Sequence, residues 1–111
     1  MNREQFEALL KPTKNGRSYQ HIVHKDNGQE LFGKEGCLTR VVRMSKKGMT
    51  EYLVGGFIHY VDPNLQYLYV TGLMDTTKQY CYQIPSCEFF VLPKTDPEAE
   101  IKYWQGVAAN L

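Results

Sequence analysis

The chain has 111 residues, of which 42% are hydrophobic and 23% are charged, with 13 Lys and Arg against 12 Asp and Glu. These values exclude a disordered chain, and the length allows one modest hydrophobic core but not two. The net charge of +1 lacks the basic excess that is typical of dedicated nucleic-acid-binding domains.

The amino-terminal stretch MNREQFEALL lacks the apolar core of a signal peptide, and no window of the chain approaches the length of a membrane span. Three cysteines, Cys37, Cys81 and Cys87, cannot all pair with one another. We therefore expect a cytoplasmic protein with reduced thiols and no membrane association.

A short helix is expected within residues 1–12, with Asn2 as the N-cap, Gln5 in the capping-box position and Pro12 ending it. Residues 17–25 alternate as a strand does, and DNGQ (26–29) is typical of a hairpin turn. CLTRVVRM (37–44) predicts a strand with one wet face, followed by a hairpin turn at SKKG (45–48).

A long strand is expected from residue 49 to residue 62, with Val54, Gly56 and Ile58 on one face. Because glycine inside a strand often marks a bulge or a bend, Gly56 is interpreted as the bend and Gly55 as slack beside it. Asp62, Pro63 and Asn64 predict a tight turn, since Asp accepts backbone hydrogen bonds and Pro presets the next φ.

QYLYVTGLM (66–74) predicts the next strand, DTTKQYCYQI (75–84) a turn and a strand, and IPSCEFFVL (84–92) a one-turn connection into a last short strand. Five to six short antiparallel strands joined by tight turns predict a mainly β protein, a small SH3-like or Sm-like barrel with a short N-terminal and an amphipathic C-terminal helix. The expected organisation is a single domain over 1–111, with the barrel in 17–92 and helices in 1–12 and 96–110.

The last expected helix begins with Asp96 as N-cap and Pro97 at the first helical position. Its apolar residues fall on one face at helical spacing: Ile101, Trp104, Val107, Ala108 and Leu111. This face either packs on the barrel or contacts a partner or a second copy through Trp104, a residue type enriched at binding hot spots.

Catalytic and metal-binding signatures do not emerge from the spacing. His21 and His24 form H-x-x-H, but residues three apart on a strand point to opposite faces. The chain has no Gly-rich phosphate loop, no G-x-S-x-G and no helical H-E-x-x-H. We expect no enzyme, no metal and no cofactor; an enzyme would need a concave pocket, for example around His59 and Asp62.

The tyrosines leave a nucleic-acid alternative open. Tyr60 and the other strand tyrosines either stack on single-stranded nucleic acid or pair across strands on the outer face of the sheet. The basic residues Arg40, Arg43 and Lys46 either join them in such a site or lie on a solvated strand and hairpin tip.

The stretches VGGFIHYVDPNLQYLYV and YQIPSCEFFVL resemble the YolD-like proteins, small single-domain proteins mostly of Gram-positive bacteria. The match covers about Val41 to Leu92, and its positions are Gly56, Ile58, Asp62, Pro63, Leu68, Val70, Ile84, Pro85 and Phe89. The basic and aromatic opening and the longer first helical stretch of that family are not found here. The resemblance implies a non-enzymatic accessory role beside Y-family translesion polymerases and transfers no catalytic site.

The sequence therefore predicts a non-enzymatic protein-interaction module, with an accessory role in DNA repair or translesion synthesis implied by the resemblance. Its expected partner-binding residues are Trp104, Ile101, Tyr67 and Tyr69, and a homodimer is a further possibility. The alternative is a barrel that binds single-stranded nucleic acid through Arg40, Arg43, Lys46 and Tyr60.

Overall fold

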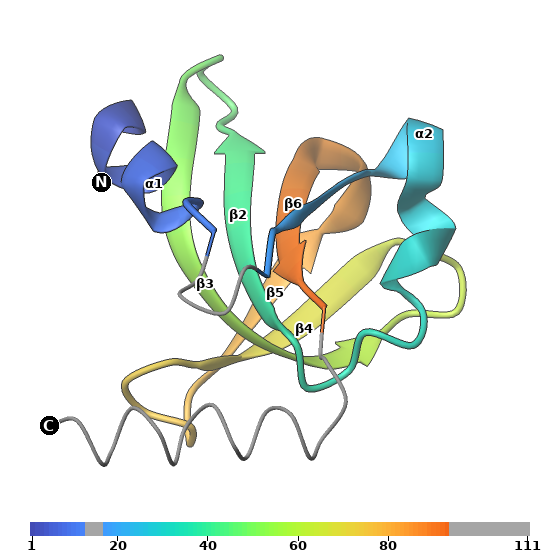
Figure 1. The fold of residues 1–111 in the computed structure, drawn as a ribbon. Coiled ribbons are helices and arrows are strands. Elements are labelled where there is room, and N and C mark those ends of the chain that lie inside the picture. Colours follow the sequence, from blue (N-terminus) through green and yellow to red (C-terminus); the bar gives the residue numbers. More distant parts are fainter. Residues whose placement is uncertain (13–16, 94–111) are drawn as a thin grey trace, which may run out of the picture.

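The protein is a mainly β structure built on one antiparallel sheet, and the computed structural model describes residues 1–12 and 17–93 (Figure 1). The strands are β1 (Gln20–Val23), β2 (Leu38–Met44), β3 (Thr50–Val61), β4 (Tyr67–Gly72), β5 (Gln79–Gln83) and β6 (Cys87–Leu92). Their order in the sheet is β1-β6-β2-β3-β4-β5, so β1 and β5 form the two edges. The C-terminal helix expected over 96–110 lies outside the described residues.

Short helical segments accompany the strands: α1 (Arg3–Leu9), α2 (His24–Asn27), η1 (Gly28–Leu31) and η2 (Ile84–Ser86). The capping box predicted for α1 is confirmed, because the Asn2 side chain accepts from the backbone N–H of Gln5 and the Gln5 side chain accepts from that of Asn2. The one-turn connection predicted before the last strand is also confirmed, as η2.

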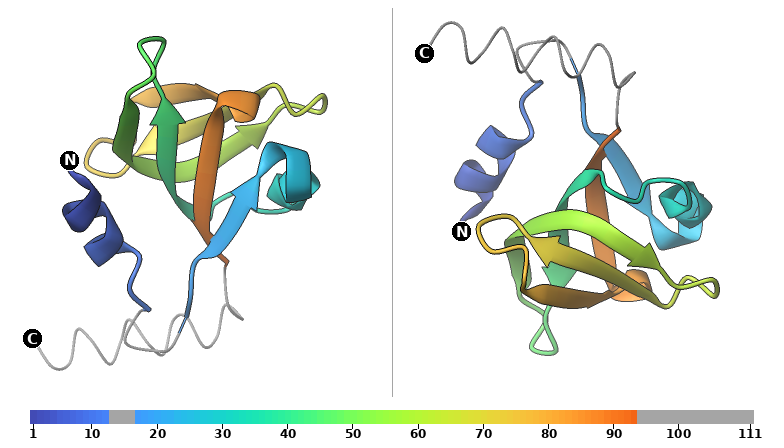
Figure 2. Two further views of the ribbon diagram at one scale, coloured as in Figure 1. Left: turned by 90° about the horizontal axis from the view of Figure 1, so that it is seen from above. Right: turned by 90° about the horizontal axis from the view of Figure 1, so that it is seen from below.

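The sheet bends strongly, so that β4 and β5 run across β2 and β6 on the other side of the core (Figure 2). The core contains Ile22 from β1, Val41 from β2, Ile58 from β3, Val70 from β4 and Phe89 from β6, each at most 2% exposed. These residues define the inner face of the sheet, and the alternating positions define the outer face.

The bend of β3 depends on two adjacent glycines with different roles. Gly55 has φ of +77°, a conformation that residues with a side chain rarely adopt, and a Cβ there would lie 2.1 Å from the Thr39 carbonyl oxygen. A Cβ on Gly56 would lie 2.0 Å from the Thr71 carbonyl oxygen. The interpretation of Gly55 as slack is therefore wrong. Gly55 is restricted by the backbone of β2, just as Gly56 is restricted by the backbone of β4 on the other side.

Register explains a second difference from the sequence prediction. The pairing of β2 with β3 shifts between Thr39 and Val41, next to Gly55. The irregularity breaks the strict alternation of β3, so that Val54 is 43% exposed while Gly56 and Ile58 are buried. Leu53, the residue before Val54, packs against the core instead.

The predicted hairpin at residues 26–29 is wrong, because the chain forms α2 and η1 there. The Asn27 side chain accepts from the backbone N–H of Val23 at 2.8 Å and donates to the carbonyl of His21 at 3.0 Å. These local bonds favour a compact helical turn over a two-residue hairpin loop. Strand β1 pairs instead with β6, with Ile22 opposite Phe89.

Candidate functional site

Half of the outer face is covered by the N-terminal helix. Phe6 of α1 is 2% exposed, and its ring lies 5.3 Å from the Tyr52 ring and 5.6 Å from the Phe90 ring, centroid to centroid. His21 of β1 stacks on Phe90 at 4.4 Å and approaches the Glu88 carboxylate at 3.2 Å. These contacts cover part of the outer surface around Phe90, which is itself half-buried.

The other half of the outer face carries an aromatic surface. Phe57 and Tyr60 of β3 and Tyr67 and Tyr69 of β4 point outward, because their neighbours Ile58, Val61, Leu68 and Val70 are buried on the inner side. We call these four residues the aromatic face. Phe57, Tyr60 and Tyr67 are 38%, 49% and 42% exposed, respectively, which leaves large apolar surfaces accessible.

Neighbouring pairs give the aromatic face a defined order. Tyr60 is the cross-strand partner of Tyr69, and their rings lie 5.9 Å apart between centroids. Tyr69 is in turn opposite Cys81 on the edge strand β5, and this thiol raises the pKa of the Tyr69 phenol above its usual value. The outward positions of β5, Gln79, Cys81 and Gln83, carry no formal charge at neutral pH.

A small hollow adjoins the aromatic face at Tyr67. It has a volume of about 180 Å³ and is lined by Gln66, Tyr67, Gln83, Pro85 and Ser86. The turn before it is fixed by Asp62, whose carboxylate accepts from the backbone N–H groups of Asn64 and Gln66. The role of Asp62 as a turn former is thereby confirmed.

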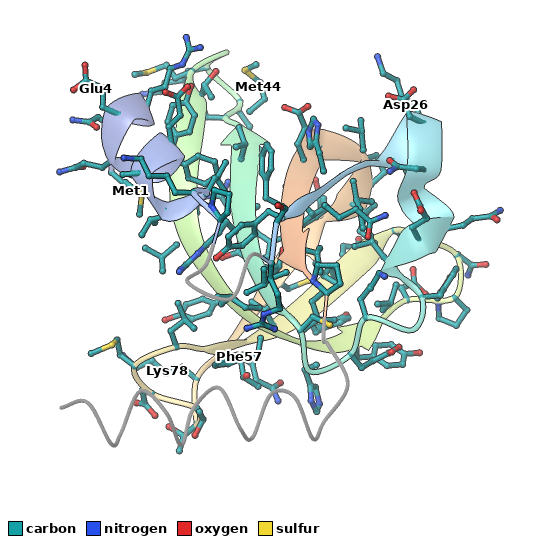
Figure 3. All side chains as sticks on the ribbon, in the orientation of Figure 1. Met1, Glu4, Asp26, Met44, Phe57 and Lys78 are labelled. Atoms are coloured by element: carbon teal, nitrogen blue, oxygen red, sulfur yellow. The ribbon has the colours of Figure 1, made fainter. Side chains whose placement is uncertain are left out.

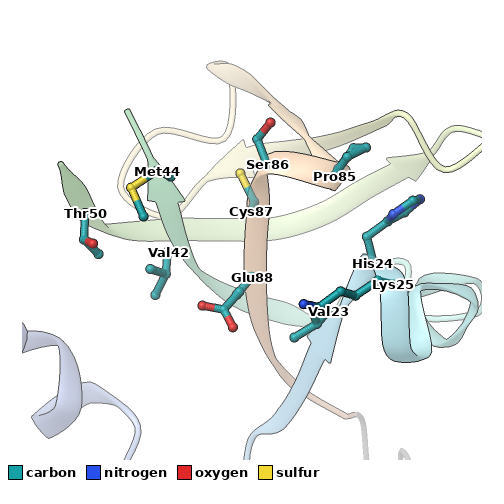
Figure 4. A pocket seen from close by; sticks show the side chains of 10 residues that line it. All are labelled: Val23, His24, Lys25, Val42, Met44, Thr50, Pro85, Ser86, Cys87 and Glu88. Atoms are coloured by element: carbon teal, nitrogen blue, oxygen red, sulfur yellow. The ribbon is translucent and has the colours of Figure 1, made fainter. Parts of the chain in front are cut away.

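A larger groove lies on the other side of η2, with a volume of about 360 Å³ (Figure 4). It is formed by three segments that are distant in sequence, and its lining residues are Val23, His24, Lys25, Val42, Met44, Thr50, Pro85, Ser86, Cys87 and Glu88. Burial raises the pKa of the Cys87 thiol to about 11, so at neutral pH this cysteine is a protonated thiol and a poor nucleophile.

The residues predicted for a nucleic-acid site are spread over the sheet. Arg43 forms an ion pair with Glu51, with 2.6 Å between Nη2 and Oε2, and Arg40 donates to the carbonyl of Val54 at 3.1 Å. Lys46 is exposed at the hairpin tip, and Tyr60 lies at the far end of β3, beside Tyr69. Arg40 and Arg43 are three residues apart on one strand and therefore point to opposite faces.

The residues predicted for partner binding divide into two groups. Tyr67 and Tyr69 lie together on the aromatic face, whereas Ile101 and Trp104 lie outside the described residues. Sequence reasoning missed Phe57, because it assigned only Val54, Gly56 and Ile58 to one face of β3 and did not consider the residues on the opposite face. Its signal was the position between two residues of the buried face, Gly56 and Ile58.

Within residues 1–12 and 17–93, no three His, Cys, Asp or Glu side chains gather in a way that could hold a metal ion. Likewise, none of the helices described here has the length and apolar character needed to cross a bilayer. Comparisons of the chain with protein-family models, curated proteins and solved structures gave no match.

Proposed function

We propose that this protein is a non-enzymatic protein-interaction module and that the aromatic face is its binding surface. The observation that carries the proposal is the grouping of Phe57, Tyr60, Tyr67 and Tyr69 on one uncharged stretch of sheet, three of them well exposed. Aromatic side chains dominate binding energy at protein interfaces because each one buries a large rigid surface. The hollow beside Tyr67 offers room for one side chain of a partner.

We further propose that the architecture is a small barrel of the SH3-like or Sm-like kind. The strand order β6-β2-β3-β4-β5, the hairpins that join β2 through β5, and the single helical turn of η2 before β6 support this assignment. In this view, β1 and α1 are additions: β1 extends the sheet beside β6, and α1 covers the outer side at Tyr52 of β3 and Phe90 of β6.

The partner class follows from the resemblance to YolD-like proteins. That resemblance implies an accessory role in DNA repair, with a Y-family translesion polymerase as the first partner to test, and a cytoplasmic location remains the expectation from the amino-terminal stretch and the cysteines. The nucleic-acid alternative is less favoured, because Arg43 is neutralised by Glu51 and Arg40 lies away from Tyr60.

The test is a titration of the immobilised full chain with a purified Y-family polymerase and, in parallel, with a fluorescent single-stranded oligonucleotide. We expect Tyr60→Ala and Tyr67→Ala each to weaken polymerase binding about 10-fold, the usual effect of removing an interface aromatic anchor. Met74→Ala is the matched control, because Met74 is 100% exposed and lies outside the aromatic face.

Two results would overturn the proposal. One is polymerase binding that is equal for all variants, which would remove the aromatic face as the surface. The other is binding of the oligonucleotide alone, with a steep salt dependence and loss in Arg40→Ala and Lys46→Ala, which would establish the nucleic-acid alternative.

A further inference from the structure

The two halves of the outer face differ in their cover. Phe6 of α1 covers the part around Phe90, where ring contacts join Phe6 to Tyr52 and Phe90, and Phe90 to His21. Over the aromatic face, in contrast, Phe57 and Tyr60 stay well exposed. Figure 3 shows Phe57 on the same side of the molecule as Lys78 and opposite Met44 at the hairpin tip.

Strand register places the end of β6 in line with the aromatic face. Leu92 pairs with Leu38, Leu38 with Phe57, Phe57 with Thr71, and Thr71 with Gln79. Cross-strand partners point to the same side of a sheet, so all five residues belong to the outer face. The chain therefore leaves the sheet after Leu92 at the row that contains Phe57.

Burial along this row is uneven. Leu92 points outward and is not part of the core cluster on the inner face, yet it is only 6% exposed. Phe57, two strands away in the same row, is 38% exposed. The apolar outer surface thus begins beside the exit of the chain and continues across β3 and β4.

The residues that follow have the length and the pattern to cover this surface. Neighbouring strands lie about 4.8 Å apart, so the row from β6 to β5 spans roughly 19 Å. A helix over 96–110 would be about 22 Å long. The apolar residues of the segment fall on one face at helical spacing: Ile101, Trp104, Val107 and Ala108 within this range, and Leu111 directly after it.

We propose that the segment 94–111 docks in cis on the aromatic face, with Trp104 packed against the rings of Phe57 and Tyr69. The segment then occupies the surface that the proposed function assigns to a partner, and a partner binds by displacing it. The displacement by a partner rests on the proposed function, whereas the docking of the segment does not.

Trp104 is the single tryptophan of the chain and reports on the docking directly. In the full-length protein we expect a blue-shifted emission maximum relative to the urea-unfolded chain. Docking buries a large part of the indole surface, so we expect the acrylamide quenching constant to be about 3-fold lower than in the unfolded chain. Because the docking is intramolecular, this protection is expected to be independent of protein concentration.

Variants separate the aromatic face from other surfaces. Phe57→Ser and, as a second variant, Tyr69→Ser should move Trp104 quenching towards the unfolded value, while Met74→Ser leaves it unchanged. Far-UV circular dichroism confirms that each variant is folded. Quenching that equals the unfolded value in the wild-type chain, or that is indifferent to both ring variants, would overturn the proposal. Protection that disappears on dilution would assign the surface to a second copy instead.

A last measurement keeps this inference apart from the proposed function. Ile101→Asp introduces a charge into the apolar face of the segment, so it should release Trp104 and strengthen polymerase binding in the full chain. If Ile101→Asp releases Trp104 but the polymerase does not bind, the docking proposal is supported and the proposed function is contradicted. Unchanged quenching in Ile101→Asp would contradict the docking whatever the polymerase does.

Discussion

At the scale of single residues, the two glycines of β3 show how a backbone contact constrains a sequence position. Gly55 and Gly56 each approach a carbonyl oxygen of a neighbouring strand, Thr39 on one side and Thr71 on the other. A side chain at either position would push β2 or β4 out of register. The bend that brings β4 across the core therefore depends on this pair.

Alanine substitution measures the effect. Gly48 also has a positive φ, of +79°, but a Cβ there would meet nothing within 4 Å, so Gly48→Ala is the control for backbone strain alone. We expect Gly48→Ala to cost about 1 kcal/mol and Gly55→Ala about 3 kcal/mol or more, because the clash adds to the strain. Urea unfolding measures both; equal losses would show that the carbonyl contact does not matter.

Cys87 gives the protein a predictable alkaline instability. Burial raises its pKa from 9.0 to about 11, so between these values the folded state holds a proton that the unfolded state has released. The stabilisation is complete below pH 9.0 and is lost as the pH rises towards 11. Unfolding free energy measured by urea titration should fall over this interval.

Cys87→Ala is expected to make that fall shallower without removing it. Burial also raises the pKa of the Tyr82 phenol, which adds a loss in the same direction. A slope that is identical in wild type and Cys87→Ala would show that the thiol does not contribute. In the folded protein, iodoacetamide at about pH 8 should modify the exposed Cys81 well before Cys87, of which roughly one thiol in a thousand is ionised.

At the scale of elements, α1 is held to the sheet by one side chain. Phe6 supplies the only fully buried ring of the helix and contacts Tyr52 and Phe90, which belong to different strands. A seven-residue helix is too short to be stable by itself, so its existence depends on this packing.

Phe6→Ala should therefore detach α1 while the sheet stays folded. We expect a loss of about 2–3 kcal/mol, below the usual core value because a terminal helix can unfold locally. Hydrogen exchange should show lost protection at the amides of α1 and retained protection in β6. Asn2→Ala, which removes the cap and keeps Phe6, should cost only about 1 kcal/mol. Loss of protection across the whole sheet in Phe6→Ala would contradict the local role.

The elements also show which sequence signals were sufficient. Turn chemistry at Asp62 and the capping box at Asn2 act within four residues, and the sequence predicts both correctly. DNGQ fails as a hairpin signal because the Asn27 side chain hydrogen-bonds the backbone of Val23 and His21, and these bonds hold the chain in a helical turn. Strict alternation fails at Val54 because a bulge depends on the neighbouring strand.

At the scale of the whole molecule, sites made from distant segments are hidden from a single sequence. Tyr67 and Tyr69 were identifiable as one surface, since they alternate on one strand. Their union with Phe57 and Tyr60 depends on the register of β3 against β4, which the irregularity between Ile58 and Tyr60 shifts. The groove along η2 is formed by α2, the β2–β3 hairpin and β6 together, and no local sequence pattern predicts that these segments lie side by side.

The pairing of β1 with β6 has a consequence for biosynthesis. Ile22 finds its partner in Phe89, so the first strand made waits for the last one before it can enter the sheet. During translation, β2 to β5 can pair in turn as hairpins, while β1 and its apolar residue Ile22 have no partner strand until β6 has been made. The sheet is therefore complete only after β6 has been made, and until then the open edge of β2 is a site for chaperone recognition or for mispairing between nascent chains.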